Sequence, residues 1–308
     1  MEELLILAAA PRSGNHLLRG LLDGHPELLV PPDEDYFVRQ LTRSRSLRLR
    51  ARLCSARGAP DLYREIQKDG HFEKLVSGGT DNSFDTAGLL DLDAYYDYVR
   101  SHHHRFSTTG VVRTHFEALE VALSKESPGS RRKVYFCAMQ TRRGDLENCG
   151  EIIGRSYKTR TLFLFRDPRS HFHSVLGRDP EADVEKFCEK QRRNWNSVND
   201  FEKRFGPVMR VAFGSILQDT ERVMRDICDY SGIAFDPCVL EFTQGGQETW
   251  SNSSHSRQRG IDASAATRYV DELPRKYIDI IERDCPAELL SPMGIEAGQN
   301  TSAATSAT

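Results

Sequence analysis

The 308-residue chain lacks the features that mark several large protein classes. No apolar run approaches the roughly 20 residues that span a bilayer, which predicts a protein without an integral membrane segment. The formal net charge of −3 is not the basic excess of a general nucleic-acid binder. The seven cysteines are odd in number and include no C-x-x-C pair, which argues against a disulfide framework or a zinc site and favours buried thiols.

The N-terminus also lacks the pattern of a secretory leader. The apolar run 4–10 is short, and Glu2 and Glu3 precede it, whereas a signal peptide carries positive charge there. We therefore expect a buried strand at 4–10 and a cytoplasmic protein for the chain as it stands. Residues 298–308 are small and polar, which predicts a disordered tail after one domain that spans residues 1–297.

Two apolar segments, 4–10 and 161–165, predict buried parallel strands that each lead into a loop and a helix. Neither alternates apolar with polar residues, as expected of strands covered on both faces. The remaining predicted elements are strands at 110–112, 134–137 and 208–213 and helices at 182–205, 219–230 and 274–285. This alternation predicts an α/β fold in which helices flank a central parallel sheet.

The first strand leads into the loop Pro11-Arg12-Ser13-Gly14-Asn15-His16, which has the properties of a phosphate-binding loop. A glycine in a strand-to-helix turn lets backbone N–H groups approach an anion, and the helix N-terminus adds its positive dipole end. Arg12 supplies a full charge, and Ser13, Asn15 and His16 supply side-chain donors. The nucleotide P-loop G-x-x-x-x-G-K-[ST] is absent, because Asn15 and His16 replace its last two residues. The alternative is a structural turn with an incidental arginine.

A second cluster follows the strand at 161–165. Arg166 stands at the carboxyl end of that strand, where open α/β sheets bind ligands. If the segment after Pro168 is helical, Ser174 and Arg178 share a face. Two cations and a hydroxyl in this arrangement suit a terminal phosphate. The alternative is a surface cluster of salt bridges.

Together the two loops resemble the sulfotransferase family, whose donor is 3′-phosphoadenosine 5′-phosphosulfate (PAPS). In that family a P-x-S-G loop after the first strand holds the 5′-phosphosulfate, and an R-D-P-R…S segment after a later strand holds the 3′-phosphate. Within the family, residues 11–26 and 166–178 look most like the tyrosylprotein branch. The resemblance covers most of residues 4–290, with gaps near 39–105 and 116–133, and implies a fold like that of the P-loop nucleotide kinases.

The resemblance also implies a role for each matching position. Arg12 matches the loop cation that stabilises the oxygen leaving with the nucleotide. The implied donor ligands are Ser13, Gly14, Asn15, His16 and Leu17 at the 5′-phosphate, Arg166, Ser174 and Arg178 at the 3′-phosphate, and Phe213 beside the nucleotide. Ser254 and Arg268 match a late Ser and Lys near the donor more loosely, and a solvated surface is the alternative for both.

Two regions resemble those that supply a general base in the family. In the tyrosylprotein branch a Glu follows the first helix, and Asp33, with Glu34 beside it, takes that place here. In the cytosolic branch the base is a His in a K-T-H motif after a strand, and Arg113-Thr114-His115 looks like that motif. Both alternatives stay open.

One family residue has no clear counterpart. Met139 and Gln140 fall where the second catalytic Lys would be, and Arg113, Arg142 or Arg143 are its candidate replacements. No metal is expected, because a sulfuryl group carries less charge than a phosphoryl group. The contiguous histidines 102–104 do not share a helix face, so they do not form a metal site.

These patterns predict sulfuryl transfer from PAPS to a hydroxyl or amine of a glycan, peptide or small-molecule acceptor. One alternative is a nucleotide-dependent kinase, against which the missing Lys-Ser/Thr pair speaks. Another is a non-catalytic nucleotide-binding module, which the missing second Lys would explain. Residues 37–60 hold seven arginines and no acidic residue, which indicates a solvated helix face or a lid that attracts an anionic acceptor.

Overall fold

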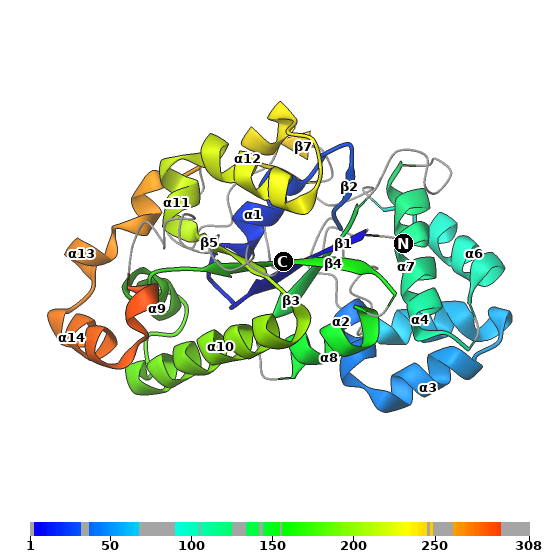
Figure 1. Cartoon of the computed structure of the whole chain (residues 1–308), viewed down its shortest axis with the longest axis horizontal. Helices are drawn as coiled ribbons and strands as arrows, with labels where there is room; N and C mark the ends of the chain where they lie inside the picture. The colour runs from blue at the N-terminus through cyan, green and yellow to red at the C-terminus, as the bar shows by residue number, and fades with distance from the viewer. Residues whose placement is uncertain are drawn as a thin grey trace, which may run out of the picture.

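A parallel five-stranded sheet with strand order β2-β3-β1-β4-β5 forms the centre of the computed structural model (Figure 1). The structure describes residues 3–31, 37–67, 90–104, 106–124, 134–141, 144–154, 156–244, 247–248 and 261–290. The strands are β1 (Glu3–Ala9), β2 (Leu28–Leu29), β3 (Val134–Gln140), β4 (Lys158–Phe165) and β5 (Val208–Ala212). This architecture confirms the predicted α/β fold.

Strand β1 lies at the middle of the sheet and packs on both faces. Leu4, Ile6 and Ala8 belong to one hydrophobic cluster, whereas Leu5 and Leu7 belong to the other. Successive side chains of a strand point to opposite faces, so an unbroken apolar run fills both. The apolar run 4–10 is therefore buried on both faces, as its lack of alternating polar residues predicted.

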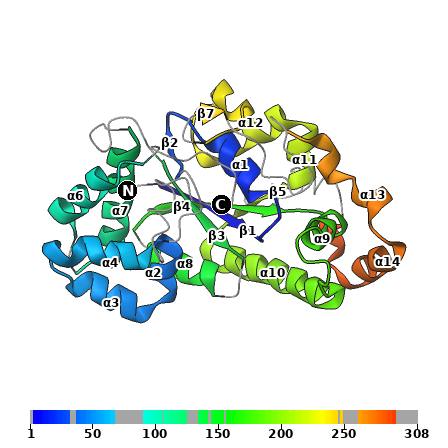
Figure 2. The same cartoon turned by 180° about the vertical axis from the view of Figure 1, so that it is seen from behind.

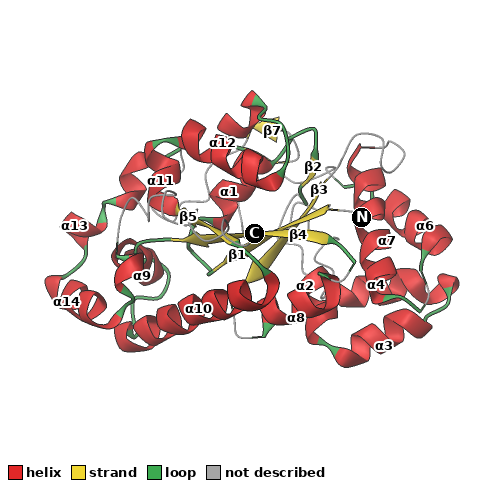
Figure 3. Cartoon of the chain, viewed as in Figure 1, coloured by secondary structure: helices red, strands yellow, loops and turns green. Residues whose placement is uncertain are grey.

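Helices cover both faces of the sheet (Figure 3). One face carries α1 (Asn15–Leu22), α11 (Phe213–Gln218) and α12 (Thr220–Ser231). The other carries α8 (Asp145–Ile153) and α10 (Val184–Phe205). At one end, α9 (Pro168–Leu176), α13 (Tyr269–Glu272) and α14 (Arg275–Asp284) pack with the start of α10 around a third cluster. None of the described helices is both long and apolar enough to cross a bilayer.

The opposite end of the molecule is helical (Figure 2). It consists of α2 (Phe37–Arg43), α3 (Arg45–Leu53), α4 (Ala59–Ile66), α6 (Leu92–His102) and α7 (Thr108–Ser124), and all of these lie between β2 and β3 in the chain. A short hairpin of β6 (Thr243–Gln244) and β7 (Gln247–Glu248) lies beside α1. This helical region corresponds to the part of the sequence in which the family resemblance had its gaps.

The strand predicted at 110–112 is wrong, because α7 covers these residues. Val111, Val112, Phe116 and Leu119 are all fully buried, and their spacing is that of one helix face. A three-residue apolar run does not distinguish a strand from a buried helix, and the longer pattern decides. The other predicted strands and helices are confirmed within a few residues. The predicted tail, 298–308, lies outside the described residues.

Candidate functional site

The two predicted phosphate-binding segments meet because their strands are neighbours. β1 pairs with β4 in parallel, with Ala9 opposite Leu164, so the loop after β1 and the segment after β4 leave the same edge of the sheet. The Nε and Nη2 atoms of Arg12 donate to Ser174 Oγ at 3.3 and 3.2 Å. Arg166 Nη1 donates to the carbonyl of Arg12 at 3.4 Å. Residues 162 positions apart thus form one cluster.

The loop after β1 has an unusual backbone. Arg12 has φ of 71° and Gly14 has φ of 100°, both in the left-handed region. Ser13 Oγ closes the turn by donating to the carbonyl of Ala10 at 2.6 Å. The N-cap residue of α1 is Gly14, which has no side chain with which to cap the first turn. The N–H groups of that turn and the positive end of the helix dipole are therefore oriented as an anion would require.

Phe213 fits the loop closely. A Cβ placed on Gly14 would lie 2.2 Å from Phe213 Cδ2, so only glycine allows the ring to pack there. Phe213 also makes a cation–π contact, because the guanidinium of Arg166 lies 4.6 Å from the centroid of its ring. The first residue of α11 therefore contacts both predicted phosphate-binding segments.

Several cations converge on this cluster. Burial and the neighbouring charges of Arg12 and Arg268 lower the pKa of Arg166 to about 10. Burial, and then the charge of Arg178, lower the pKa of Arg12. Each guanidinium remains charged at neutral pH, and these like charges disfavour one another. A bound polyanion would relieve that repulsion.

Arg178 reaches the cluster by a route other than the predicted helix face. The helix after Pro168 is confirmed, but it ends at Leu176. The N–H of Arg178 donates to the carbonyl of Val175 at 3.0 Å, which folds the chain back after the helix end. Its side chain is exposed and close enough to affect Arg12.

Asp167 and Arg169 pair with each other beside the cationic cluster. The Asp167 carboxylate caps α9 by accepting from the N–H of Arg169 at 2.9 Å, and it also pairs with the Arg169 guanidinium at 2.7 Å. Arg169 pairs further with Glu282 at 2.8 Å, which ties α9 to α14. Arg268 forms an ion pair with Asp262, although its charge also acts on Arg166. Of the described arginines here, Arg12 and Arg166 instead contact hydroxyls and carbonyls.

His171, which was not predicted as a site residue, forms a hydrogen bond to the backbone of the loop after β1. Its Nε2 donates to the carbonyl of Pro11 at 2.8 Å, and its Nδ1 accepts from Gln191 Nε2 at 3.1 Å. A carbonyl can only accept, so Nε2 carries the hydrogen and the ring is neutral. Burial lowers the pKa of His171 to about 3. The residue lies inside the Arg166–Ser174 segment, but the sequence does not reveal which of its two histidines faces the loop.

His115 is not brought to this cluster. It lies on α7, fully buried, with Phe37 stacked on its ring at 4.1 Å and the Tyr95 hydroxyl 2.7 Å from its Nδ1. Figure 1 places α7 and α9 at opposite ends of the molecule. The strand-then-motif context that suggested His115 is absent, since the segment is helical. The other predicted bases, Asp33 and Glu34, lie outside the described residues, as do Ser254, Arg142 and Arg143.

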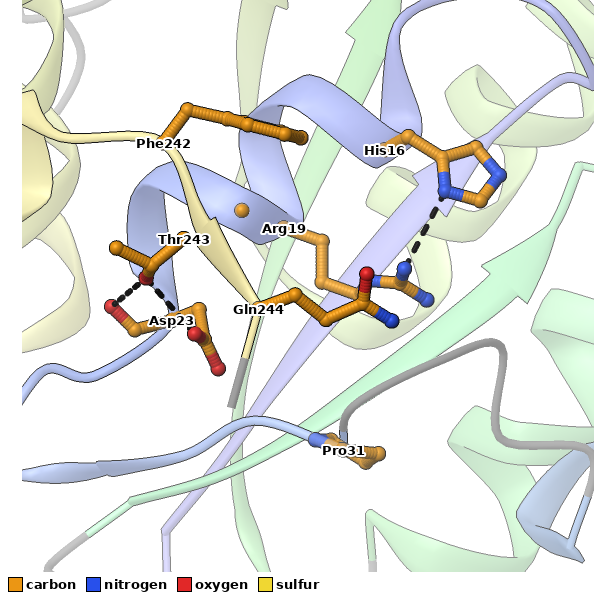
Figure 4. Close-up of a pocket in the computed structure, with 8 residues that line it drawn as sticks. His16, Arg19, Asp23, Pro31, Phe242, Thr243 and Gln244 are labelled. Atoms are coloured by element: carbon orange, nitrogen blue, oxygen red, sulfur yellow. Dashed lines mark hydrogen bonds between the residues drawn. The ribbon is translucent and has the colours of Figure 1, made fainter. Parts of the chain in front are cut away.

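A small pocket adjoins the loop (Figure 4). It begins at His16 on α1 and reaches Pro31, the last described residue before Asp33. Arg19 Nη2 lies 3.3 Å from His16 Nδ1. The residues that line the pocket are His16, Arg19, Gly20, Asp23, Pro31, Phe242, Thr243 and Gln244. The pocket therefore lies between the first turn of α1 and Pro31.

No family model and no curated protein matches the sequence, whereas solved structures match its fold. The chain is similar to the sulfotransferase domain of the Synechococcus PCC 7002 olefin synthase, with 16% identity over 91% of this chain and 93% of that chain and a TM-score of 0.54. It is also similar to the sulfotransferase domain from the curacin biosynthetic pathway, with 15% identity over 92% of this chain and 99% of that chain and a TM-score of 0.53.

Proposed function

We propose that this chain, which has the sulfotransferase fold, transfers a sulfuryl group from PAPS to a hydroxyl or amine of an acceptor. The observation that carries the proposal is the convergence of Arg12, Arg166, Ser174 and Arg178 at the carboxyl ends of β1 and β4. The fold alone would not suffice, because function depends on the site that a fold carries.

The described residues fit a donor with two anionic ends. The loop 12–17 would hold the 5′-phosphosulfate through backbone N–H groups and the Arg12 guanidinium. Arg166, Ser174 and Arg178 would hold the 3′-phosphate, with Phe213 beside the nucleotide. Arg268, through its charge on Arg166, adds to the positive potential. Burial, and then neighbouring arginines, lower the pKa of Arg12 and of Arg166, and this supports the assignment because a bound polyanion would stabilise both charged groups.

The chemistry follows from this placement. In-line transfer forms a bond from the acceptor oxygen to sulfur and breaks the bond from sulfur to the bridging phosphate oxygen. Negative charge grows on that leaving oxygen, and Arg12 with the loop N–H groups would stabilise it. The acceptor hydroxyl must lose a proton, and a carboxylate at Asp33 or Glu34 would accept it. Both follow Pro31, which lines the pocket beside the loop. For this reason we prefer them to His115.

Calorimetry with adenosine 3′,5′-bisphosphate tests the proposal. We expect micromolar binding without added metal, and about tenfold to hundredfold weaker binding in Arg178→Gln, because a hydrogen bond to a charged group contributes about 1.5–3 kcal/mol. Arg222→Gln on α12 is the matched control, since that exposed arginine only pairs within its own helix. Preference for ATP with Mg²⁺ would favour a kinase and refute the proposal.

Turnover separates an enzyme from a binding module. Arg12→Lys keeps a cation but not the guanidinium that reaches Ser174, and we expect a fall of about a hundredfold in kcat with a smaller change in donor affinity. Tight donor binding by the wild-type protein with no transfer to any hydroxyl or amine in an acceptor screen would support the non-catalytic module instead.

A further inference from the structure

Three highly exposed apolar side chains gather at one place on the surface. Leu49 and Leu53 on α3 are 57% and 58% exposed, and Phe106 is 63% exposed. The N–H of Phe106 donates to the carbonyl of Arg52 at 2.9 Å, and Arg52 Nε donates to the carbonyl of Phe106 at 3.2 Å. These bonds hold Phe106 against the last turn of α3. Val270 on α13 is a further exposed apolar side chain, at another site.

The backbone at Phe106 has a conformation that costs energy. Its φ of 66° lies in the left-handed region, which bulky residues rarely adopt. In a folded chain such a cost is commonly offset by burial of the side chain, yet most of this ring faces water. Because the backbone of Phe106 is strained and its side chain is exposed, we infer that this part of the surface is covered when the protein binds a partner.

Most of the arginine-rich segment 37–60 is occupied inside the molecule. Arg39 and Arg43 lie against the buried Asp145, with distances to its carboxylate of 3.7 and 3.1 Å. Arg50 forms a bidentate pair with Glu65 at 2.5 and 2.6 Å. The arginines that predicted a solvated helix face or a lid therefore mostly form contacts between helices. Arg48 likewise donates to the carbonyls that end α2.

Of the three remaining arginines, Arg45 and Arg52 lie beside the exposed apolar side chains. Arg45, Leu49, Arg52 and Leu53 have the spacing of one helix face. Among the described residues, neither Arg45 nor Arg52 forms an ion pair with a carboxylate. We call Arg45, Leu49, Arg52, Leu53 and Phe106 the α3 patch. It combines apolar side chains with two cations that have no acidic partner in the part of the chain that the structure describes.

We propose that the α3 patch docks reversibly on an anionic lipid surface. Basic amphipathic helices with Leu and Phe on their apolar side bind at the boundary between headgroups and acyl chains. The guanidinium groups of Arg45 and Arg52 would pair with lipid phosphates or carboxylates while Leu49, Leu53 and Phe106 enter the apolar layer.

Size and shape favour lipid over a folded protein partner. A stable protein interface buries about 800 Å² on each partner, far more than three exposed apolar side chains provide. A few inserted side chains with adjacent cations are enough for reversible membrane binding. Figure 1 shows α3 at the outer edge of the molecule and at the opposite end from α9. Docking there would leave the cationic cluster uncovered, and the proposal does not depend on the proposed function.

Vesicle sedimentation of the full chain tests this proposal. We expect binding to phosphatidylcholine vesicles that contain phosphatidylserine, weakened by salt, and none to pure phosphatidylcholine vesicles. Arg45→Gln should weaken binding about fivefold, as expected for one cation near the surface. The double variant Leu49→Ala with Leu53→Ala should weaken it by about tenfold or more. The matched controls Arg222→Gln and Val270→Ala should bind like the wild-type protein.

Three results would overturn the proposal. The first is the absence of binding to phosphatidylserine vesicles by a wild-type protein with a native circular dichroism spectrum. The second is vesicle binding that the double leucine variant leaves unchanged, or that the two controls weaken equally. The third is retention on a poly-glutamate column without vesicle binding, which would assign the patch to an acidic protein.

Discussion

Acid should destabilise the fold through His171, by an amount that the structure allows one to calculate. The ring is neutral and buried, and its pKa is about 3 in the folded chain against 6.5 for a free imidazole. Between these two values the unfolded chain binds the proton and the folded chain does not, so stability falls as pH falls. The loss begins near pH 6.5 and is complete near pH 3. At pH 5 it amounts to about 2 kcal/mol, since each pH unit below the unfolded pKa contributes about 1.4 kcal/mol.

The assay compares urea unfolding of the wild-type protein and His171→Gln at pH 7 and pH 5. A glutamine can still donate to the carbonyl of Pro11 but does not titrate, so the variant should lose about 2 kcal/mol less than the wild-type protein over this range. Other histidines titrate equally in both proteins and cancel in the difference. Identical pH dependence of the two proteins would refute the assignment of a neutral, loop-supporting His171.

Further predictions concern the loop, the helical region and the donor. Gly14→Ala should lower the free energy of unfolding by at least about 1–2 kcal/mol in thermal unfolding, because Gly14 has a left-handed φ and a Cβ there would clash with Phe213. Adding Phe213→Ala to this variant should remove the clash but not the cost of the left-handed φ. Asp145→Asn should lower the free energy of unfolding in urea by about 3–5 kcal/mol, because it leaves Arg39 buried beside a neutral group. Glu65→Gln, which removes an exposed ion pair with Arg50, should lower it by less than about 1 kcal/mol. Binding of adenosine 3′,5′-bisphosphate should be the same with and without EDTA in calorimetry, because arginines would neutralise its phosphates.

The part of the site that could be predicted from the sequence consists of local features next to strands. The loop 11–16 and the segment 166–174 each follow an unalternated apolar run, and parallel strands place their carboxyl ends at one edge. That reasoning brought Arg12, Arg166 and Ser174 together across the chain. It did not foresee the bend that carries Arg178 past the end of α9, because helix ends depend on local hydrogen bonding that composition does not specify.

The helical region shows where such reasoning fails. Val111 and Val112 read equally well as a strand or as two positions of a buried helix face, and the choice made His115 look like a base after a strand. The role of His171 was equally hidden, because it depends on a contact with the carbonyl of Pro11, 160 positions away in the chain. Long-range packing decides both cases, and a single sequence does not encode it in a readable pattern.

The position of β1 has a consequence for how the protein forms. Both strands that pair with β1 come from beyond the helical region, so β1 leaves the ribosome well before either partner strand has been made. Arg12 and Ser174, 162 positions apart, can meet only after those pairings close a very long loop, which makes assembly of the sheet slow. Until β3 has been made, β1 is an apolar strand without a partner, and chaperones would be needed to protect it. The contact between Arg12 and Ser174 would therefore form late in folding.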